Sequence, residues 1–326
     1  MNKRIIEKAL FVAVVLALVL VMLYCGIKLL ETENQPSNAA GTGFQTKTVE
    51  YQGQKYFPRQ DITVVMVLGI DQRGEAVSSG GYRNEGSADM VTLLVFDRQR
   101  QVCDLLCLNR DSMVTMPVLG IGGRQAGTMY GQLALSHTYG SGLEDSCENT
   151  RKTVSDLLLG IEIDYYVALR MDGIALLNDG VGGVTVEVTD DFSAVTDDLP
   201  MGLLTLTGQQ ALQFVQSRKD VGTQLNLSRM ERQKQYMEGF VAALKAGLKG
   251  DSLYASKLYD RASAYIVTDC SAAVLNRLAA DYGEYSLGRV ISPAGENIQG
   301  DPYYEFHLEE EALKALAIEV FFEPKQ

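Results

Sequence analysis

Histidine and paired cysteine are scarce in this sequence, which argues against a zinc site. The chain has two histidines, His137 and His307, and five cysteines, none of them in a Cys-x-x-Cys pair. Structural zinc sites need four such ligands at short spacings. The sequence also has no tryptophan, no Gly-x-Ser-x-Gly nucleophile motif, no Walker A loop and no internal repeat. We expect His137 to pack inside the fold rather than bind a metal.

Basic charge is also in short supply. The chain carries 29 lysines and arginines against 41 acidic residues, a formal net charge of −12. Nucleic acid is bound mainly through basic surfaces, so we expect no nucleic-acid partner. On such an acidic background, any cluster of arginines is more informative than it would be in a basic protein.

Charged residues are absent from residues 9 to 27, a run dominated by Leu, Val and Ala. A helix of this length can cross about 30 Å of hydrocarbon. A buried core helix and a cleaved signal peptide are the alternatives. The run is longer than a typical signal-peptide core, and no small-x-small cleavage site follows it at once. Lys3, Arg4 and Lys8 precede it, which predicts a single-pass anchor in the cell membrane with the C-terminal domain outside.

The rest of the chain predicts one large α/β domain. Continuous apolar runs that predict strands alternate with segments of helical periodicity. The predicted strands are 62–71, 90–96, 102–108, 165–169, 184–188 and 286–291. The predicted helices are 131–138, 143–159, 171–178, one capped by Thr207, and 229–248. The expected organisation is a cytoplasmic stub at 1–8, the transmembrane anchor at 9–30, a polar linker at 31–60 and the domain at 61–322.

Charged residues gather where the first three predicted strands begin or end. Asp71 ends the first strand, Asp89 begins the second, and Arg110 and Asp111 follow the third. Binding sites in α/β sheets lie at such ends. Carboxylates there can hold Mg²⁺, and arginines can clamp phosphate oxygens. The arginines considered are Arg73, Arg110, Arg218, Arg229 and Arg232.

Structural roles are the alternatives for each of these residues taken alone. The aspartates could form turns, Arg110 and Asp111 could be a structural ion pair, and Arg229 and Arg232 could be a solvated helix face. Asp190 and Asp191 are expected in a solvated loop. The residues by themselves favour an extracytoplasmic α/β domain that handles a phosphorylated ligand.

A series of short motifs adds to this reading. In chain order they are Leu-Gly-Ile-Asp-Gln-Arg (68–73), Ser-Ala-Asp-Met (87–90), Leu-Asn-Arg-Asp-Ser (108–112), Ala-Leu-Ser-His-Thr-Tyr-Gly (134–140), Gly-Ile-Glu-Ile-Asp-Tyr-Tyr (160–166), Gly-Val-Gly-Gly-Val-Thr-Val (180–186), Leu-Thr-Gly-Gln-Gln-Ala-Leu (206–212) and Arg-Met-Glu-Arg-Gln (229–233). In this order behind a signal anchor, they resemble the LytR–CpsA–Psr family of cell-envelope proteins over about residues 61–322.

This resemblance implies a fold, an activity and a set of partners. The fold would be a three-layer α/β/α domain with a central mixed sheet and a hydrophobic tunnel for a lipid tail. The protein would transfer a glycopolymer, such as teichoic acid or capsule, from a polyprenyl-pyrophosphate carrier at the membrane lipid to peptidoglycan, with Mg²⁺ as the cofactor. The main catalytic task would be to neutralise the pyrophosphate.

The resemblance also implies roles for individual residues. Asp71 and Asp89 would place Mg²⁺. Arg73, Arg110 and Arg218 would bind phosphate, while Asp111 would orient Arg110 or act as a base. The remaining members of the polar wall would be Arg229, Arg232 and Gln233.

The sequence departs from the family pattern at four positions. Ser87 and Gln132 stand where the family has Arg and Lys, Gln216 replaces the first arginine of an Arg-x-Arg pair, and Asn226 replaces an aspartate. Arg83 is the candidate replacement for the arginine missing at Ser87. Lost cations at a pyrophosphate site would slow transfer. The alternatives are therefore a lipid-phosphate or glycan binding module and a Mg²⁺-dependent (pyro)phosphatase.

Overall fold

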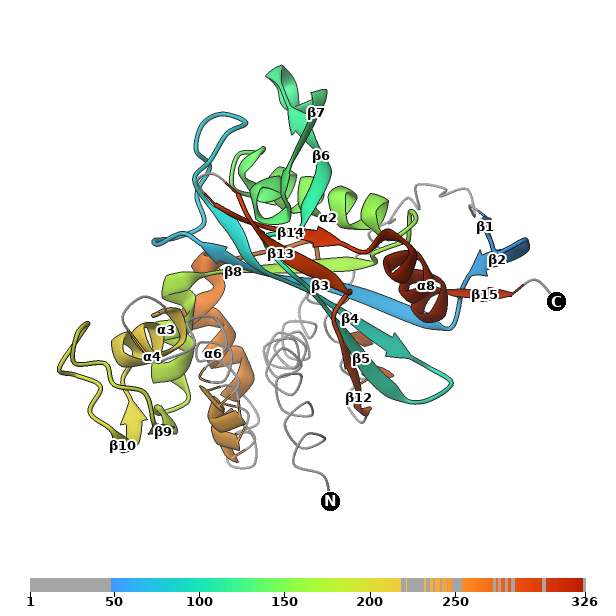
Figure 1. Ribbon diagram of the computed structural model, residues 1–326. Helices are drawn as coiled ribbons and strands as arrows, with labels where there is room; N and C mark the ends of the chain where they lie inside the picture. The colour runs from blue at the N-terminus through green and yellow to red at the C-terminus, as the bar shows by residue number, and fades with distance from the viewer. Residues whose placement is uncertain are drawn as a thin grey trace, which may run out of the picture.

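A six-stranded mixed sheet organises the computed structural model (Figure 1). The model describes residues 48–217, 221, 254–271, 285–300 and 303–324, with scattered positions between 232 and 282. In spatial order the strands are β11 (Ile266–Thr268), β8 (Tyr165–Arg170), β3 (Ile62–Asp71), β4 (Ser87–Asp97), β5 (Val102–Leu108) and β12 (Ser286–Ile291). The pairs β3–β8 and β5–β12 are parallel, and the other three pairs are antiparallel. The predicted mixed α/β class with a central mixed sheet is confirmed.

The central strand β3 is apolar along its length because both of its faces are covered. Val64, Met66 and Leu68 belong to one hydrophobic core, and Val65 and Val67 to a second core on the opposite face. Successive side chains of a strand point to opposite faces, so a continuous apolar run is the expected pattern for such a strand. The predicted bounds of β3, β5 and β12 agree with the structure.

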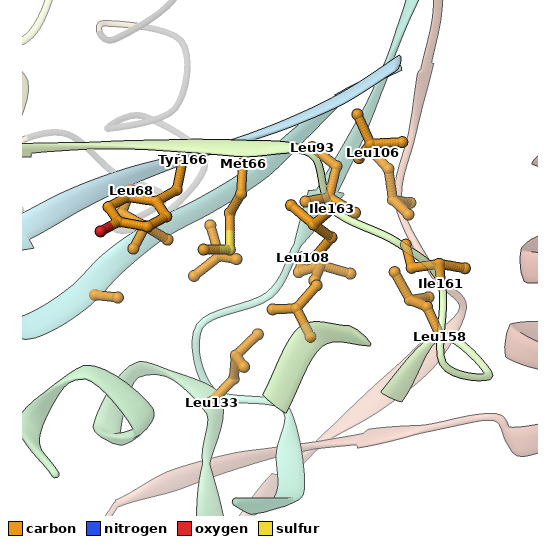
Figure 2. Close-up of a cluster of buried hydrophobic side chains, with 14 of the residues drawn as sticks. Met66, Leu68, Leu93, Leu106, Leu108, Leu133, Leu158, Ile161, Ile163 and Tyr166 are labelled. Atoms are coloured by element: carbon orange, nitrogen blue, oxygen red, sulfur yellow. The ribbon is translucent and has the colours of Figure 1, made fainter. Parts of the chain in front are cut away.

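One face of the sheet is covered by the 3-10 helix η2 (Leu133–Thr138), α2 (Glu144–Leu157) and α8 (Glu310–Phe321). Figure 2 shows side chains of this core, with Leu133 and Leu158 packed toward the side chains of the strands. The helix predicted at 131–138 is instead the end of a strand followed by a 3-10 helix.

The opposite face of the sheet is covered by helical residues, described at scattered positions between 274 and 282. Leu278 and Tyr282 pack against Leu94 and Phe96, and the rings of Tyr282 and Phe96 stack with centroids 4.6 Å apart. The Tyr282 hydroxyl also lies 2.7 Å from the hydroxyl of Thr63. Burial on both faces explains why so many strand residues are apolar.

A further core, which we call the satellite core, lies beside the sheet (Figure 1). Its elements are α3 (Met171–Gly180), β9 (Val184–Val188), β10 (Gly202–Leu206), α4 (Gly208–Gln216) and α6 (Tyr254–Ala262). The predicted cap of α4 is confirmed, because Thr207 and Gln210 form a reciprocal capping box. A single undivided domain was predicted at 61–322, so this separate core was not expected from the sequence.

Three smaller sheets were also missed. One consists of β1 (Val49–Tyr51), β2 (Gln54–Pro58) and β15 (Phe322–Pro324), so part of the segment expected as a linker is regular structure. The others are the hairpins β6 (Met113–Leu119) with β7 (Gln125–Gln132), whose turn is η1 (Ile121–Gly123), and β13 (Gly295–Gln299) with β14 (Tyr304–Leu308). The remaining short helix is η3 (Ser263–Tyr265).

The membrane anchor predicted at 9–30 lies outside the residues that the structure describes. Among the described residues, no helix combines the length and apolarity needed to span a bilayer.

Candidate functional site

Three strand ends meet at one edge of the central sheet. Because β3, β4 and β5 are antiparallel neighbours, the end of β3, the start of β4 and the end of β5 lie together. Asp71 pairs in register with Ser87, and the Arg110–Asp111 dipeptide follows β5 directly. The structure therefore brings Asp71, Asp89, Arg110 and Asp111 to the same edge, as the sequence predicted.

A β-bulge at Asp89 changes how this carboxylate is presented. The register between β3 and β4 passes from Gly69 opposite Met90 to Ile70 opposite Ala88, which leaves Asp89 as the extra residue of β4. Bulges break the strict alternation of side chains and re-aim the residue that they contain. The Ser87 hydroxyl donates to Asp89 Oδ1 at 2.9 Å. Ser87 thus supports the carboxylate at the position where the family carries a cation.

Arg110 lies between two carboxylates. Its Nη1 forms an ion pair with Asp89 Oδ1, and its Nε lies 3.4 Å from Asp111 Oδ1. The Nε atom is buried, makes no hydrogen bond among the described residues and faces the Asp111 carboxylate. The Arg110 carbonyl accepts from the backbone N–H of Ala134, which ties the residue to the start of η2. The two carboxylates thus hold the guanidinium in place.

Asp111 is positioned by its backbone and by an amide side chain. Asn109 Oδ1 accepts from the Asp111 N–H at 3.0 Å, a turn that sets the direction of the chain after β5. Gln132 Nε2 donates to Asp111 Oδ1 at 3.0 Å and to the Tyr304 carbonyl at 2.8 Å. Gln132 is therefore a neutral donor that bridges the carboxylate and β14.

The donor set fits Mg²⁺ only if a phosphate completes it. Among the described residues, no three His, Cys, Asp or Glu side chains gather as a metal site. Asp71 and Asp89 provide two carboxylates at the same sheet edge. Mg²⁺ commonly binds one or two carboxylates, with waters and substrate phosphates filling the other positions. The residues present are compatible with that mode of binding.

The loop between β3 and β4 contains Arg73 and Arg83. Both are exposed, and the Arg83 guanidinium lies over the Tyr139 ring, 4.2 Å from its centroid. Cation–π packing holds Arg83 in a defined position while leaving its charge accessible. Neither arginine has a described ion pair with Asp89 or Asp111, so the structure does not join them to that group.

Two buried polar side chains fasten this loop, and one of them, Asn84, was not predicted from the sequence. Asn84 Nδ2 donates to the carbonyls of His137 and Gly140 at 2.8 and 3.0 Å. His137 Nδ1 lies 2.7 Å from the Gly86 carbonyl, and burial lowers the pKa of His137 to about 4. His137 is therefore a packing residue, as predicted. Asn84 follows the Gly/Ser-rich stretch as an isolated amide, a weak signal on its own.

Arg170 at the end of β8 holds the same loop from the other side. It is buried, and it donates to the carbonyls of Glu75 and Val77 at 2.6 and 3.3 Å. Burial lowers the pKa of Arg170, because the charged form loses its hydration. Its position at a strand end was the only sequence signal for this role.

Arg232 lies in a different place from the Asp89–Arg110 group. Its buried guanidinium forms an ion pair with Asp190, packs over the Phe192 ring and donates to the carbonyls of Phe214 and Ser217. It thereby fastens the end of α4 to the satellite core. The expectation that Asp190 lies in a solvated loop is wrong, because this carboxylate pairs with a buried arginine.

Several predicted site residues cannot be placed. Arg218, Arg229 and Gln233 lie outside the described residues, as does Asn226. Gln216 is the last residue of α4. Their roles in binding stay predictions.

Aspartates and an arginine lie together where the strands of a mixed sheet end, beside a loop held by buried polar side chains. This arrangement agrees with the site that the sequence motifs predicted. The chain belongs to the LytR_cpsA_psr family, whose model matches residues 23–317. Its curated relatives include the polyisoprenyl-teichoic acid–peptidoglycan teichoic acid transferases TagU of Oceanobacillus iheyensis and Enterococcus faecalis. The first is 26% identical over 254 residues, which is 76% of this chain and 72% of the relative. The second is 28% identical over 218 residues, 67% of this chain and 65% of the relative.

Solved structures share the fold. A Streptococcus agalactiae protein, gbs0355, matches with a TM-score of 0.62 and 21% identity over 80% of this chain and 86% of that one. TagV of B. subtilis matches with a TM-score of 0.57 and 21% identity over 80% and 96%. TagT bound to LI-WTA matches with a TM-score of 0.57 and 23% identity over 80% and 90%.

Proposed function

We propose that this protein is a membrane-anchored transferase that moves a glycopolymer from a polyprenyl-pyrophosphate carrier to peptidoglycan. The family membership and the teichoic acid transferase names of its relatives support this function. The anchor at 9–30 would hold the domain outside the cell membrane, close to a lipid-linked donor. Teichoic acid is the polymer that those names suggest.

The arrangement around Arg110 carries the proposal. A guanidinium fixed by Asp89 and Asp111, with 29% of its side chain exposed, can present its charge to an anionic group. Arginine binds phosphate oxygens in a fork geometry, and in a partly buried site this attraction exceeds its value in water. We therefore assign Arg110 to the pyrophosphate of the donor. Arg73 and Arg83 would contact the phosphate that carries the polymer, and Arg218 is proposed as a further phosphate ligand.

Asp111 is suited to the acceptor side. In the transfer, an acceptor hydroxyl oxygen bonds to the phosphorus that carries the glycan, and the bond from that phosphorus to the bridging oxygen breaks. Lipid monophosphate leaves, and the hydroxyl proton passes to the Asp111 carboxylate. Gln132 donates to Oδ1 of Asp111, which keeps the carboxylate oriented. The reach of a carboxylate base to such a hydroxyl is a hydrogen-bond distance.

Asp71 and Asp89 would hold Mg²⁺ together with the donor phosphates. The ion would neutralise negative charge that grows on the leaving phosphate. The Ser87 hydroxyl and the bulge would keep the Asp89 carboxylate aimed at that position.

The test is a joining assay with the full-length protein in lipid nanodiscs. It would contain a short polyprenyl-pyrophosphate-linked glycan, soluble peptidoglycan oligomers and Mg²⁺, with products identified by mass spectrometry. A joined product that requires Mg²⁺ and is lost in Asp89→Ala and Asp111→Asn supports the transferase. Release of free glycan without joining would replace this function with hydrolysis. Donor binding without turnover would indicate a binding module. The neutral Gln132 would then explain the lack of catalysis, because it supplies no positive charge to the pyrophosphate.

A further inference from the structure

Two exposed tyrosines flank the acceptor side of the candidate site. Tyr130 on β7 and Tyr304 on β14 are 59% and 60% exposed. Each leaves a large apolar ring in water, and such a ring can pack against a ligand while its hydroxyl forms a hydrogen bond. Their position relative to Asp111 makes them informative.

Tyr304 is tied to Asp111 through a single atom. Gln132 Nε2 donates both to Asp111 Oδ1 and to the Tyr304 carbonyl, at 3.0 and 2.8 Å. A second contact fixes β14 at the same point, because the Phe306 N–H donates to the Asp111 carbonyl at 2.9 Å. The β13–β14 hairpin is therefore fastened to the turn that carries the proposed base. These contacts use the backbone of Tyr304 and leave its ring exposed.

Tyr130 stands on the same face of β7 as Gln132, because residues two apart in a strand point the same way. Two residues of strand separate their Cα atoms by about 7 Å. Tyr130 therefore lies two residues from Gln132 on β7. Tyr304 belongs to β14, and its carbonyl accepts a hydrogen bond from Gln132.

The chemistry of this surface is that of a neutral glycan site. Flat apolar rings stack against the C–H faces of sugars, and the phenol hydroxyls and the Gln132 carbonyl can hydrogen-bond sugar hydroxyls. The Asp111 carboxylate is flanked by the Arg110 guanidinium and by the uncharged Gln132 amide, and it is the amide that is bonded to β14. On the side of β14 the neighbour of Asp111 is thus neutral, which suits a sugar. Tyrosine also loses little conformational freedom when it binds.

We propose that Tyr130 and Tyr304 form a subsite for the glycan strand of the acceptor, and that they bring a sugar hydroxyl to Asp111. This inference rests on the proposed function, since it names where the acceptor of that transfer binds. The donor phosphates would contact the Asp71, Asp89 and Arg110 side, so donor and acceptor would approach Asp111 from different directions.

The test separates sugar binding from turnover. Full-length wild-type protein and the variants Tyr304→Ala, Tyr304→Phe and Tyr130→Ala are titrated calorimetrically with soluble peptidoglycan oligomers, with no donor present. We expect both alanine variants to weaken binding at least tenfold and Tyr304→Phe to stay within about threefold, because the ring remains. Leu203→Ala, an exposed apolar residue on β10 in the satellite core, is the matched control and should bind as the wild type does.

The joining assay supplies the second readout. The alanine variants should raise KM for the oligomers at least tenfold, with kcat and KM for the donor unchanged. Unchanged oligomer binding in both alanine variants would overturn the subsite, even if the wild type joins the polymers normally. Weakened binding in a protein that forms no joined product would support the subsite and reject the transferase. A loss of thermal stability in Tyr304→Ala that Tyr304→Phe does not share would assign a structural role and overturn the proposal.

Discussion

Replacing Arg110 by alanine separates chemistry from architecture. The guanidinium is paired with Asp89 and lies near Asp111, and 29% of its side chain is exposed. If Arg110 neutralises the pyrophosphate, its loss removes a charge-stabilising donor, and such donors are worth about 10²–10³ in kcat. We therefore expect turnover to fall by roughly that factor. The KM for the acceptor should change little.

The expected effect on stability is much smaller. Removing Arg110 leaves two carboxylates near each other, but Ser87 still donates to Asp89 and Gln132 to Asp111. With the site partly open to water, the loss should be about 1–2 kcal/mol of unfolding free energy. In a domain of this size, that lowers Tm by about 2–8 °C. Circular dichroism melting and the joining assay would be run on the same preparations.

Arg100→Ala is the matched control. Arg100 forms ion pairs with Asp97 and Asp104 at the opposite edge of the same sheet, at 2.8 and 2.7 Å. We expect a similar fall in Tm with turnover unchanged. Turnover of Arg110→Ala within threefold of wild type would refute the assignment. A stability loss above about 4 kcal/mol would make the pair structural.

Three further predictions concern stability. His137 has a folded pKa of about 4, below its ordinary 6.5, so the unfolded chain binds a proton first as pH falls. Stability should therefore decline between pH 6.5 and 4 by up to about 3 kcal/mol; His137→Asn should flatten that part of a Tm-against-pH curve. Arg232→Ala should cost about 3 kcal/mol in urea unfolding, because Asp190 loses its buried partner; a change below 0.5 kcal/mol, roughly that of a surface substitution, would contradict this. Gly208→Ala should destabilise by about 1–3 kcal/mol despite better helix propensity, because its Cβ would lie 2.6 Å from the Ala175 carbonyl; unchanged thermal unfolding would show that α3 and α4 can move apart.

Periodicity and strand ends were sufficient to predict the centre of the fold. The run that became β3 has one polar residue, Thr63, before its terminal aspartate, which is the pattern expected of a strand buried on both faces. The runs that became β5 and β12 each carry one charged residue, Asp104 and Arg289, and these two form an ion pair. The Asp71, Asp89 and Arg110 group followed from the same logic, because antiparallel neighbours bring those ends together. The bulge that re-aims Asp89 was not predictable, since it is a shift of register between strands and has no local signature.

The strands that were not predicted form by pairing with other segments, some of them far away in the chain. β1 and β2 are short and polar, and they become strands by pairing with each other and with β15. The Gln132 side chain looked like a lost cation in the sequence. Its actual bonds join Asp111 to β14, more than 170 positions away in the chain, and only the tertiary structure shows this. The contacts of Arg232 were not predictable for a similar reason, because its partners Asp190 and Phe214 come from separate parts of the chain.

The pairing of β15 with β2 means that this small sheet can form only after α8 and β15 have been synthesised. Glu323 lies opposite Phe57, the Phe321 carbonyl accepts from the Arg59 N–H, and α8 supplies Leu313 and Phe321 to the main core. The three-stranded sheet is thus incomplete until residues 322–324 have been synthesised. Contacts between such distant segments form slowly and leave apolar surface uncovered until they do. An emerging chain would therefore have to be kept from aggregating until α8 and β15 have left the ribosome, and a stop codon shortly before α8 should yield a protein that is degraded rather than a weakened enzyme.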